Sequence, residues 1–414
     1  GYDVATDANG NIYVTGFFQG QAPFLSSRGD GDIFVAKLDP DGEILWATAA
    51  GGPHLDSARS IAVDASGHVY VTGGFRQQAT FGDTTLSCNG GEDVFVARLS
   101  PAGQVLWAIA LGGPGFDEGH DVVVDASGDA YITGLFNEQA AFGATTLASQ
   151  GSHDIFLARL SSAGKVLWAT SAGGPGRDIG FALARDADGN VYLTGNIDPQ
   201  AVLGTTTLGS QHWDTFVAKF AGDGEALWAT AATGPSDNDG GNDIVVDDNG
   251  DVIVTALFED NVVIGGTSIT AAGQEDTLVA KLSRDGELVW ATALGGAGRD
   301  LGQALVLGTG ATIYLTGLFD GTTTFGSTSL SAEEHGDLFI TELSPAGEVL
   351  RAMRASGPGQ VTGSGIATDA QGQLFVTGAF NKTATFGAHH RTASGKDDVF
   401  LWKLDPSWYA PLLT

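Results

Sequence analysis

The chain repeats one unit of about 60 residues seven times along its 414 residues. The most regular phrase is a ten-residue segment that begins at Asp7, Asp64, Asp125, Asp186, Asp247, Gly308 and Asp369. Consecutive starts lie 57 residues apart once and 61 residues apart five times. A fixed period of this length predicts a ring or array of similar structural units, because one unit cannot bury its apolar face alone.

Each unit contains four short segments rich in β-branched and aromatic residues, which favours strands. In the second copy these segments are SIAVD, HVYVTG, DVFVARL and QVLWAIA, and we call them strands A to D. Turn sequences such as DASG and SPAG separate A from B and C from D. Strand C begins with an acid in every copy: Asp32, Asp93, Asp154, Asp214, Asp276, Asp337 and Asp398. An acid shared by all seven copies favours an architectural hydrogen bond over an active site.

Four antiparallel strands repeated seven times predict an all-β fold, a seven-bladed β-propeller. A linear β-solenoid is the alternative, but its coils are usually shorter. We expect a single domain over 1–414, with blades at 1–51, 52–112, 113–173, 174–233, 234–295, 296–356 and 357–414. A segment of about 19 residues between strands B and C predicts an extra hairpin in each blade.

The sixth and seventh copies depart from the repeat in strand D. The other five copies carry a Trp there, at positions 46, 107, 168, 228 and 290, whereas the sixth copy has Arg351. We interpret these Trp as packing between blades, and a row of sugar-stacking platforms is the alternative. The seventh copy has only SWYAPLLT, and we expect Ser407–Leu413 to form an irregular fourth strand that closes the ring, with Trp408 in place of the repeated Trp. Pro411 limits the length of such a strand.

The phrases DASGxxYVTG, DxFVARLSPxGxxLWA and GGPGxDxG together resemble the bacterial SBBP-type β-propeller repeat. The resemblance covers essentially the whole chain and implies a protein that is extracellular or on the bacterial cell surface. It implies no particular reaction, because propellers carry enzymes, lectins and scaffolds alike.

The net charge of the chain limits the classes of binding partner that we expect. With 19 Lys and Arg against 49 Asp and Glu, the chain has a net charge of −30, which disfavours nucleic acid and anionic membranes. No apolar run is long enough for a transmembrane helix. A single Cys excludes an intrachain disulfide and CxxC motifs. The chain starts at Gly1 without a signal peptide, so we expect it to be part of a larger precursor.

The B–C and D–A connections are long and share one face, which makes that face the expected functional one. The D–A connection repeats an acid, at Asp56, Asp117, Asp178, Asp239 and Asp300. One interpretation is a partial ring of carboxylates at the channel entrance that binds Ca²⁺, with Asp237 in the most acidic stretch as a further ligand. The alternative is a carboxylate that caps a local turn, repeated with the unit. No other cofactor is indicated.

Departures from the repeat predict where a ligand binds. Seven of the eight His lie on the loop-rich face, His120 in a D–A connection among them. The best asymmetric spots are His212 with Trp213, and His389 with His390 and Arg391. Variation of exposed loops is the structural alternative.

We therefore expect a binding or scaffold module that recognises a carbohydrate or a surface protein on the loop-rich face. One alternative is a propeller enzyme that acts on polysaccharide at the channel mouth, although no G-x-S-x-G, P-loop, H-E-x-x-H or dinucleotide motif is present. Another is a structural part of an extracellular assembly. An asymmetric mouth with convergent His, Arg and Tyr would favour the enzyme, and seven equal pockets would favour a lectin.

Overall fold

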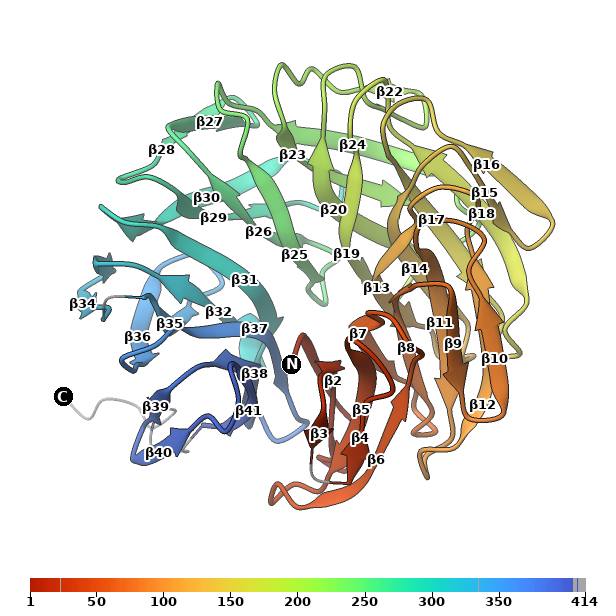
Figure 1. The fold of residues 1–414 in the computed structure, drawn as a ribbon. Helices are drawn as coiled ribbons and strands as arrows, with labels where there is room; N and C mark the ends of the chain where they lie inside the picture. The colour runs from red at the N-terminus through yellow and green to blue at the C-terminus, as the bar shows by residue number, and fades with distance from the viewer. Residues whose placement is uncertain (23, 334, 405–407, 409–414) are drawn as a thin grey trace.

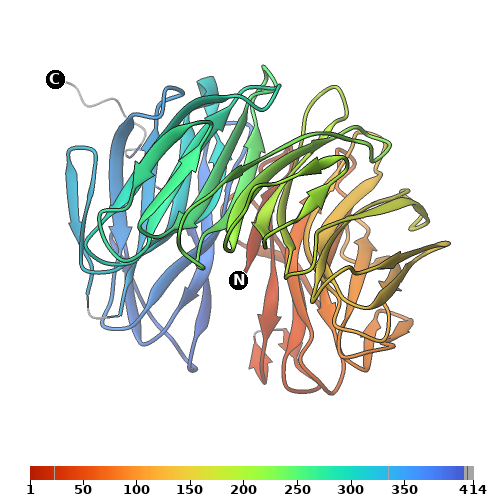
Figure 2. The same ribbon diagram turned by 90° about the horizontal axis from the view of Figure 1, so that it is seen from above.

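Each sequence repeat folds into one small antiparallel sheet, and the seven sheets stand around a common centre as the blades of a β-propeller (Figure 1). The computed structural model describes residues 1–22, 24–333, 335–404 and 408. Seen from above, the blades lie with their strands running between two faces of the molecule (Figure 2). The predicted all-β class and the seven-bladed architecture are confirmed.

Six blades have four main strands, which run from the centre outward in chain order. Blade 1 contains β1 (Asp3–Thr6), β2 (Ile12–Phe18), β5 (Asp32–Leu38) and β6 (Ile44–Ala50). Blade 2 contains β7 (Ser57–Val63), β8 (Val69–Phe75), β11 (Asp93–Leu99) and β12 (Val105–Leu111). Blade 3 contains β13 (Glu118–Val124), β14 (Ala130–Phe136), β17 (Asp154–Leu160) and β18 (Val166–Ala172). Blade 4 contains β19 (Ile179–Arg185), β20 (Val191–Ile197), β23 (Asp214–Phe220) and β24 (Ala226–Ala232).

Blades 5 and 6 follow the same order, and the seventh blade differs. Blade 5 contains β25 (Gly240–Val246), β26 (Val252–Phe258), β29 (Asp276–Leu282) and β30 (Leu288–Gly296). Blade 6 contains β31 (Asp300–Leu307), a 3₁₀ turn at Thr309–Ala311, β32 (Ile313–Phe319), β35 (Asp337–Leu343) and β36 (Val349–Ala355). Blade 7 has three main strands among the described residues: β37 (Val361–Thr368), β38 (Leu374–Phe380) and β41 (Asp398–Lys403). Most of the expected fourth strand, Ser407–Leu413, lies outside the described residues.

The predicted extra hairpin is present in every blade. The hairpins are β3 (Gln21–Ala22) with β4 (Leu25–Ser26), β9 (Gln78–Phe81) with β10 (Thr84–Ser87), β15 (Gln139–Phe142) with β16 (Thr145–Ala148), β21 (Val202–Leu203) with β22 (Thr206–Thr207), β27 (Asn261–Ile264) with β28 (Thr267–Thr270), β33 (Thr322–Phe325) with β34 (Thr328–Ser331), and β39 (Thr383–Phe386) with β40 (His389–Thr392). From blade 2 onward, each hairpin also pairs with the end of strand D of the preceding blade, as Thr80 does with Gly51. The hairpins therefore connect neighbouring blades.

Apolar packing between blades explains the near-continuous apolar runs. Phe95 of blade 2 and Ile33 of blade 1 are both essentially buried and belong to one core cluster. Strands B and C are covered by a blade on each side, so both of their faces are apolar. In blades 2 to 7 the hairpin residue that precedes Gly is apolar and buried in the core. It is Phe in four of these blades, and Phe81 lies 4.9 Å from Phe95, ring centre to ring centre.

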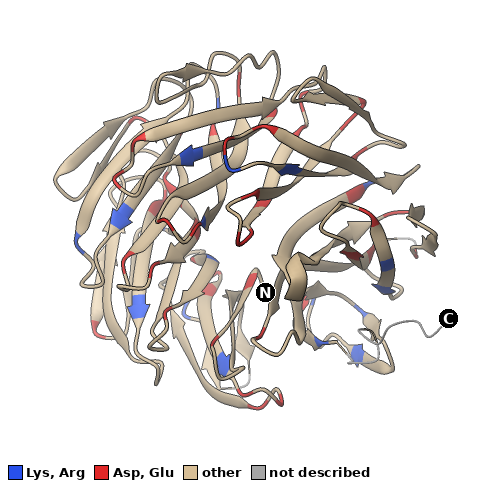
Figure 3. Cartoon of the chain, turned by 180° about the vertical axis from the view of Figure 1, so that it is seen from behind, with Lys and Arg blue, Asp and Glu red and all other residues tan. Residues whose placement is uncertain are grey.

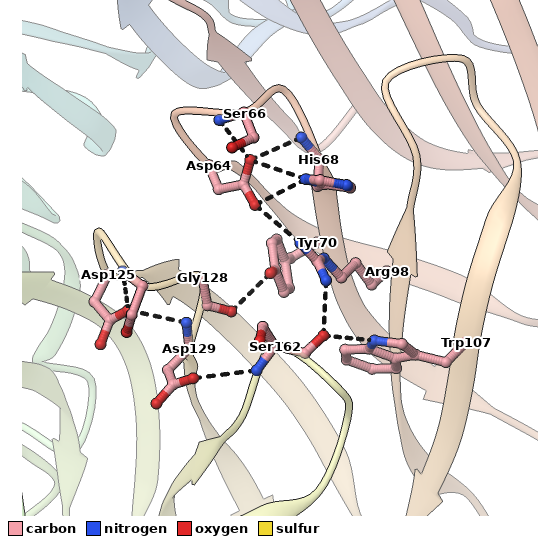
Figure 4. Close-up of polar contacts among 11 residues, drawn as sticks. Asp64, Ser66, His68, Tyr70, Arg98, Trp107, Asp125, Gly128, Asp129 and Ser162 are labelled. Atoms are coloured by element: carbon pink, nitrogen blue, oxygen red, sulfur yellow. Dashed lines mark hydrogen bonds and ion pairs between the residues drawn. The ribbon is translucent and has the colours of Figure 1, made fainter.

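The repeated Asp, Tyr and Trp form one polar unit that joins neighbouring blades (Figure 4). In blade 2, Arg98 lies over the ring of Tyr70 at 5.2 Å and contacts Asp64 at 3.2 Å. The indole N–H of Trp107 donates to the carbonyl of Ser162, in the C–D turn of the next blade, at 3.0 Å. The Asp of the A–B turn is therefore an ion-pair partner of strand C, and the Trp lies against the next blade, as predicted.

Blade 6 replaces three members of this unit together. Gly308 stands in place of the turn Asp, Glu342 in place of the basic residue, and Arg351 in place of the Trp. Arg351 pairs with Glu342 at 2.6 Å, so the ion pair is kept with its charges exchanged. The ring of Trp408, which follows blade 7 in the chain, lies 5.9 Å from that of Tyr314 in blade 6. Trp408 thus takes the place of the Trp missing from blade 6, rather than that of blade 7.

The ring closes by packing between blades 7 and 1. Val4 and Val14 of blade 1 share an apolar cluster with Phe375 of blade 7. The amino group of Gly1 donates to the carbonyl of Gly378 at 3.1 Å. No described strand of one terminus is added to the blade formed by the other.

Charge is dispersed over the propeller. Asp and Glu occupy turns and connections of all blades, as Figure 3 shows, instead of one patch. No helix among the described residues is long and apolar enough to cross a membrane.

Candidate functional site

The five repeated Asp of the D–A connections are fully buried. Asp56 is typical: its Oδ2 accepts the N–H of Gly52 at 2.7 Å and its Oδ1 the N–H of Arg76 at 3.0 Å. The same backbone partners recur at Asp117 and Asp178. These carboxylates tie the D–A connection to the residue that follows strand B.

Each of these carboxylates faces the strand-C carboxylate of the preceding blade. A Cβ built on Gly51, whose φ is 148°, would lie 2.5 Å from an oxygen of Asp32 and 3.0 Å from an oxygen of Asp56. Both carboxylates therefore lie against the backbone of Gly51. The equivalent position is Thr233 in blade 4 and Ser356 in blade 6, so glycine is not required there in every blade. Burial is the main cause that raises the pKa of Asp56 and Asp300 to about 6, and of Asp117, Asp178 and Asp239 to about 7.

Among the residues that the structure describes, no group of three or more His, Cys, Asp and Glu is arranged to hold a metal ion. A calcium site at these five Asp stays a prediction. Asp237 differs from these buried acids, because its side chain is 86% exposed and pairs with His212 at 2.7 Å.

The predicted ligand residues lie in two separate places. His212 and Trp213 stand at the start of β23, where the indole N–H of Trp213 donates to the carbonyl of Arg177 at 3.2 Å. The guanidinium of Arg177 lies 5.6 Å from the Trp213 ring, so part of this aromatic surface is already covered. His389, His390 and Arg391 lie on the exposed strand β40 of blade 7, and blades 5 and 6 separate them from the first group. The structure does not bring the two groups together.

A third group, found at the innermost strands, was not predicted as a site. Strand A of blades 2 to 7 contains a β-bulge, and one residue at each bulge has no partner in the ladder. The bulge residues of blades 2 to 7 are Arg59, His120, Phe181, Asn242, Gln303 and Ser364. Tyr2 occupies the equivalent position in blade 1. Each bulge lies near the start of strand A, shortly after the D–A connection, and therefore toward the loop-rich end of the channel. Bulges commonly re-aim a side chain near functional sites.

In blades 1 to 4 these residues contact one another and form what we call the mouth cluster, namely Tyr2, Arg59, Glu118, His120 and Phe181. Arg59 lies 5.0 Å from the Tyr2 ring and its Nε donates to Glu118 at 2.7 Å. His120 contacts the other oxygen of Glu118 at 3.4 Å. The rings of His120 and Phe181 are stacked, 5.0 Å apart with 6° between their planes.

Electrostatics fix the protonation of Glu118 in the mouth cluster. Burial pushes the pKa of Glu118 up, but the hydrogen bond and charge of His120, together with Arg59, lower it to about 2. A second ion pair, Arg76 with Glu92 at 2.8 Å, lies beside it. The cluster therefore offers a carboxylate, a guanidinium, an imidazole and two aromatic rings at one mouth of the channel.

Next to the bulges on strand A, three acids each connect one blade to the blade that follows it. Asp3, Asp121 and Asp243 belong to blades 1, 3 and 5, and they accept the N–H of Ile61, Leu183 and Leu305 in the next blade at 2.9, 2.6 and 2.7 Å. Burial raises the pKa of Asp3 to about 7 and also raises that of Asp121 and Asp243. These acids hold the inner strands together.

Two known proteins are similar to parts of this sequence, and no family model matches it. An uncharacterised WD repeat-containing protein of Acanthamoeba polyphaga mimivirus is 25% identical over 307 residues, which are 56% of this chain and 22% of that protein. The regulatory protein FlaEY of Caulobacter vibrioides is 28% identical over 233 residues, 53% of this chain and 24% of that protein. The chain spans less than a quarter of the length of either relative.

Solved propellers share the fold. An ulvan lyase, described as a new family of polysaccharide lyase, superposes with a TM-score of 0.52 at 12% identity, covering 96% of this chain and 90% of the lyase. Its sugar-bound structure gives a TM-score of 0.50. At this identity the similarity to the lyase shows the fold alone. The sequence similarity to a WD repeat-containing protein agrees with a propeller of repeated blades.

Proposed function

We propose that this propeller is a binding module whose ligand is a carbohydrate, held at the loop-rich mouth of the central channel by the mouth cluster. One observation supports this most strongly. At the bulge position the sevenfold pattern breaks, and four different side chains, Tyr2, Arg59, His120 and Phe181, lie next to one another in consecutive blades. A structural role repeated in every blade would keep one residue type, as strand C keeps its Asp.

The chemistry of the mouth cluster suits a sugar. Aromatic rings such as Tyr2 and Phe181 offer flat apolar surfaces with a defined orientation. Arg59 and Glu118 offer charge-assisted donors and acceptors for hydroxyl or carboxylate groups. Ligand sites typically combine apolar walls with a few fixed polar groups. Presentation outside the cell or on its surface is part of the same proposal and rests on the sequence resemblance.

The test is a glycan array followed by calorimetric titration of the best glycan. Arg59→Ala and Phe181→Ala should each weaken binding by about tenfold or more, because each removes a side chain at the centre of the site. Gln303→Ala is the matched control, since Gln303 occupies the same bulge position in blade 6. A blank array, or equal losses in all three variants, would contradict the proposal.

A second function is favoured by a specific observation, the placement of His120 beside Glu118 and Arg59 and of Arg59 against Tyr2. Convergent His, Arg and Tyr can serve proton transfer and charge stabilisation in an enzyme. The ulvan lyase of similar fold acts on a polysaccharide. Release of reducing ends from any array-positive polysaccharide, lost in His120→Ala and kept in Gln303→Ala, would establish an enzyme rather than a lectin.

A further inference from the structure

The outer edge of β41 is the one open strand-C edge among the described blades. In blades 1 to 6 strand C pairs on that side with strand D, whereas the described sheet of blade 7 ends at β41. Exposure records the difference: Val399 is 42% exposed, while its six equivalents are at most 3% exposed. These equivalents are Ile33, Val94, Ile155, Thr215, Thr277 and Leu338. An open edge presents unpaired N–H and C=O groups that can accept another strand.

A groove of about 770 Å³ runs along this edge between blades 7 and 1. Val399 and Leu401 of β41 lie on one side, and Leu38 and Ile44 of blade 1 on the other. The hairpin strand β40 contributes His389 and Arg391. In blade 2 the equivalent hairpin strand β10 contacts strand D, β12, and the same contact recurs in blades 3, 5 and 6. The groove therefore has the walls that hold strand D elsewhere in the ring.

One end of the groove lies at the C–D turn of blade 1, and the equivalent turns of other blades accept a strand-D Trp. In five blades the indole N–H of the strand-D Trp donates to a carbonyl in the next C–D turn, at 3.0 to 3.2 Å. In blades 2 to 4 the basic residue of strand C donates to that same carbonyl, as Arg98 does to Ser162 at 2.8 Å. The equivalent carbonyl in blade 1 is that of Pro40, which accepts the ammonium of Lys403 at 2.8 Å and receives no Trp N–H among the described residues. The position that a strand-D Trp would occupy in blade 7 is thus provided with its acceptor.

We propose that this groove binds an extended strand of a partner polypeptide, which pairs antiparallel with β41 and completes blade 7. The pairing of the other blades specifies its side chains: a Trp opposite Lys403, then aliphatic or small residues opposite Leu401 and Val399. Main-chain hydrogen bonds supply affinity and the alternate side chains supply specificity in strand addition. A second copy is a poor donor, because its own D strands are paired within blades 1 to 6.

The probe is a fluorescent peptide with the sequence of residues 165–173, KVLWATSAG, which contains a strand-D pattern of this chain. Fluorescence anisotropy should show saturable binding to the full chain. The Trp168→Ala form of the peptide should bind about tenfold more weakly or worse, as expected for loss of an aromatic anchor. Val399→Asp in the protein should weaken binding similarly, whereas Val289→Asp, at a residue that is 54% exposed on β30, should have no effect.

Hydrogen exchange locates the bound peptide, and amides of residues 398–403 should become protected when it is added. Absence of binding, or binding that is indifferent to Trp168→Ala and Val399→Asp, overturns the proposal. Binding seen only after deletion of residues 409–414 would assign the groove to the chain's own end. Sedimentation as a dimer that Val399→Asp dissociates would assign it to a second copy. Because the mouth cluster is not involved, none of these outcomes depends on the proposed function.

Discussion

The buried carboxyl pairs are the most unusual residues of the fold. At the junction of blades 4 and 5, Asp214 and Asp239 are both fully buried, and each has an oxygen without a hydrogen-bond partner. At the junction of blades 6 and 7, Val361 replaces the second acid, and Asp337 pairs with Arg354 at 2.8 Å. A lone acid is thus neutralised by Arg, whereas two facing acids are neutralised most simply by sharing a proton.

The pairs predict how stability depends on pH. The pKa of five D–A acids is raised from 3.8 to about 6 or 7 in the folded chain. Between pH 4 and 7 the folded state therefore binds more protons than the unfolded state, so the free energy of unfolding falls as pH rises through this range. Thermal unfolding should show a higher Tm at pH 5 than at pH 8. A Tm that is equal at both, or higher at pH 8, would contradict this account.

Asp239→Asn tests one pair directly. The Asn side chain keeps an acceptor for the N–H of Glu259 and offers an amide to Asp214, as a protonated acid would. We expect stabilisation at pH 8 by about 1 kcal/mol, or a Tm higher by roughly 2 °C, and a weaker pH dependence. Asp237→Asn is the control, because that side chain is 86% exposed. Equal effects of the two variants would show that general charge reduction, not the pair, is responsible.

At the scale of elements, the extra hairpins connect the blades. The N–H of Thr80 in β9 donates to Gly51 at 2.9 Å and its carbonyl accepts from Gly51 at 3.2 Å. Thr80→Pro removes this donor and should destabilise the protein by about 2 to 3 kcal/mol, measured by denaturant unfolding. Thr80→Ala keeps the backbone bonds and should cost much less. Similar losses in both variants would mean that the side chain, not the bridge between blades, matters.

The elements were largely predictable from the sequence because periodicity and turn residues are local signals. The hairpins were expected from the Phe-Gly phrase, but their pairing with the preceding blade was not. That contact joins Gly51 and Thr80, and no pattern in the repeat marks them as partners. The Asp of strand C was expected to bond a nearby loop, and Asp93 does accept the N–H of Asn89 at 3.0 Å. Its approach to Asp117 of the next blade depends on blade packing, which sequence spacing does not reveal.

At the scale of the whole molecule, the seven blades are so similar that a position where they differ indicates a specialised part of the ring. The sixth and seventh copies were recognised from the sequence as departing from the repeat in strand D. The mouth cluster was missed because Tyr2, Arg59 and Phe181 occupy a variable column that resembled a connection, and His120 was assigned to that connection instead of β13. The signal was present: the preceding column is Gly in six of the seven copies, and the bulge column has seven different residues.

The central claim is that the mouth cluster is the ligand site. Hydrogen exchange of the full chain with and without its best array glycan tests this claim most directly. We expect new protection at residues 1–4, 57–63 and 118–124, which contain Tyr2, Arg59 and His120. Protection confined to residues 209–214 or 386–392, around Trp213 or His390, with none at the inner strands, would contradict it.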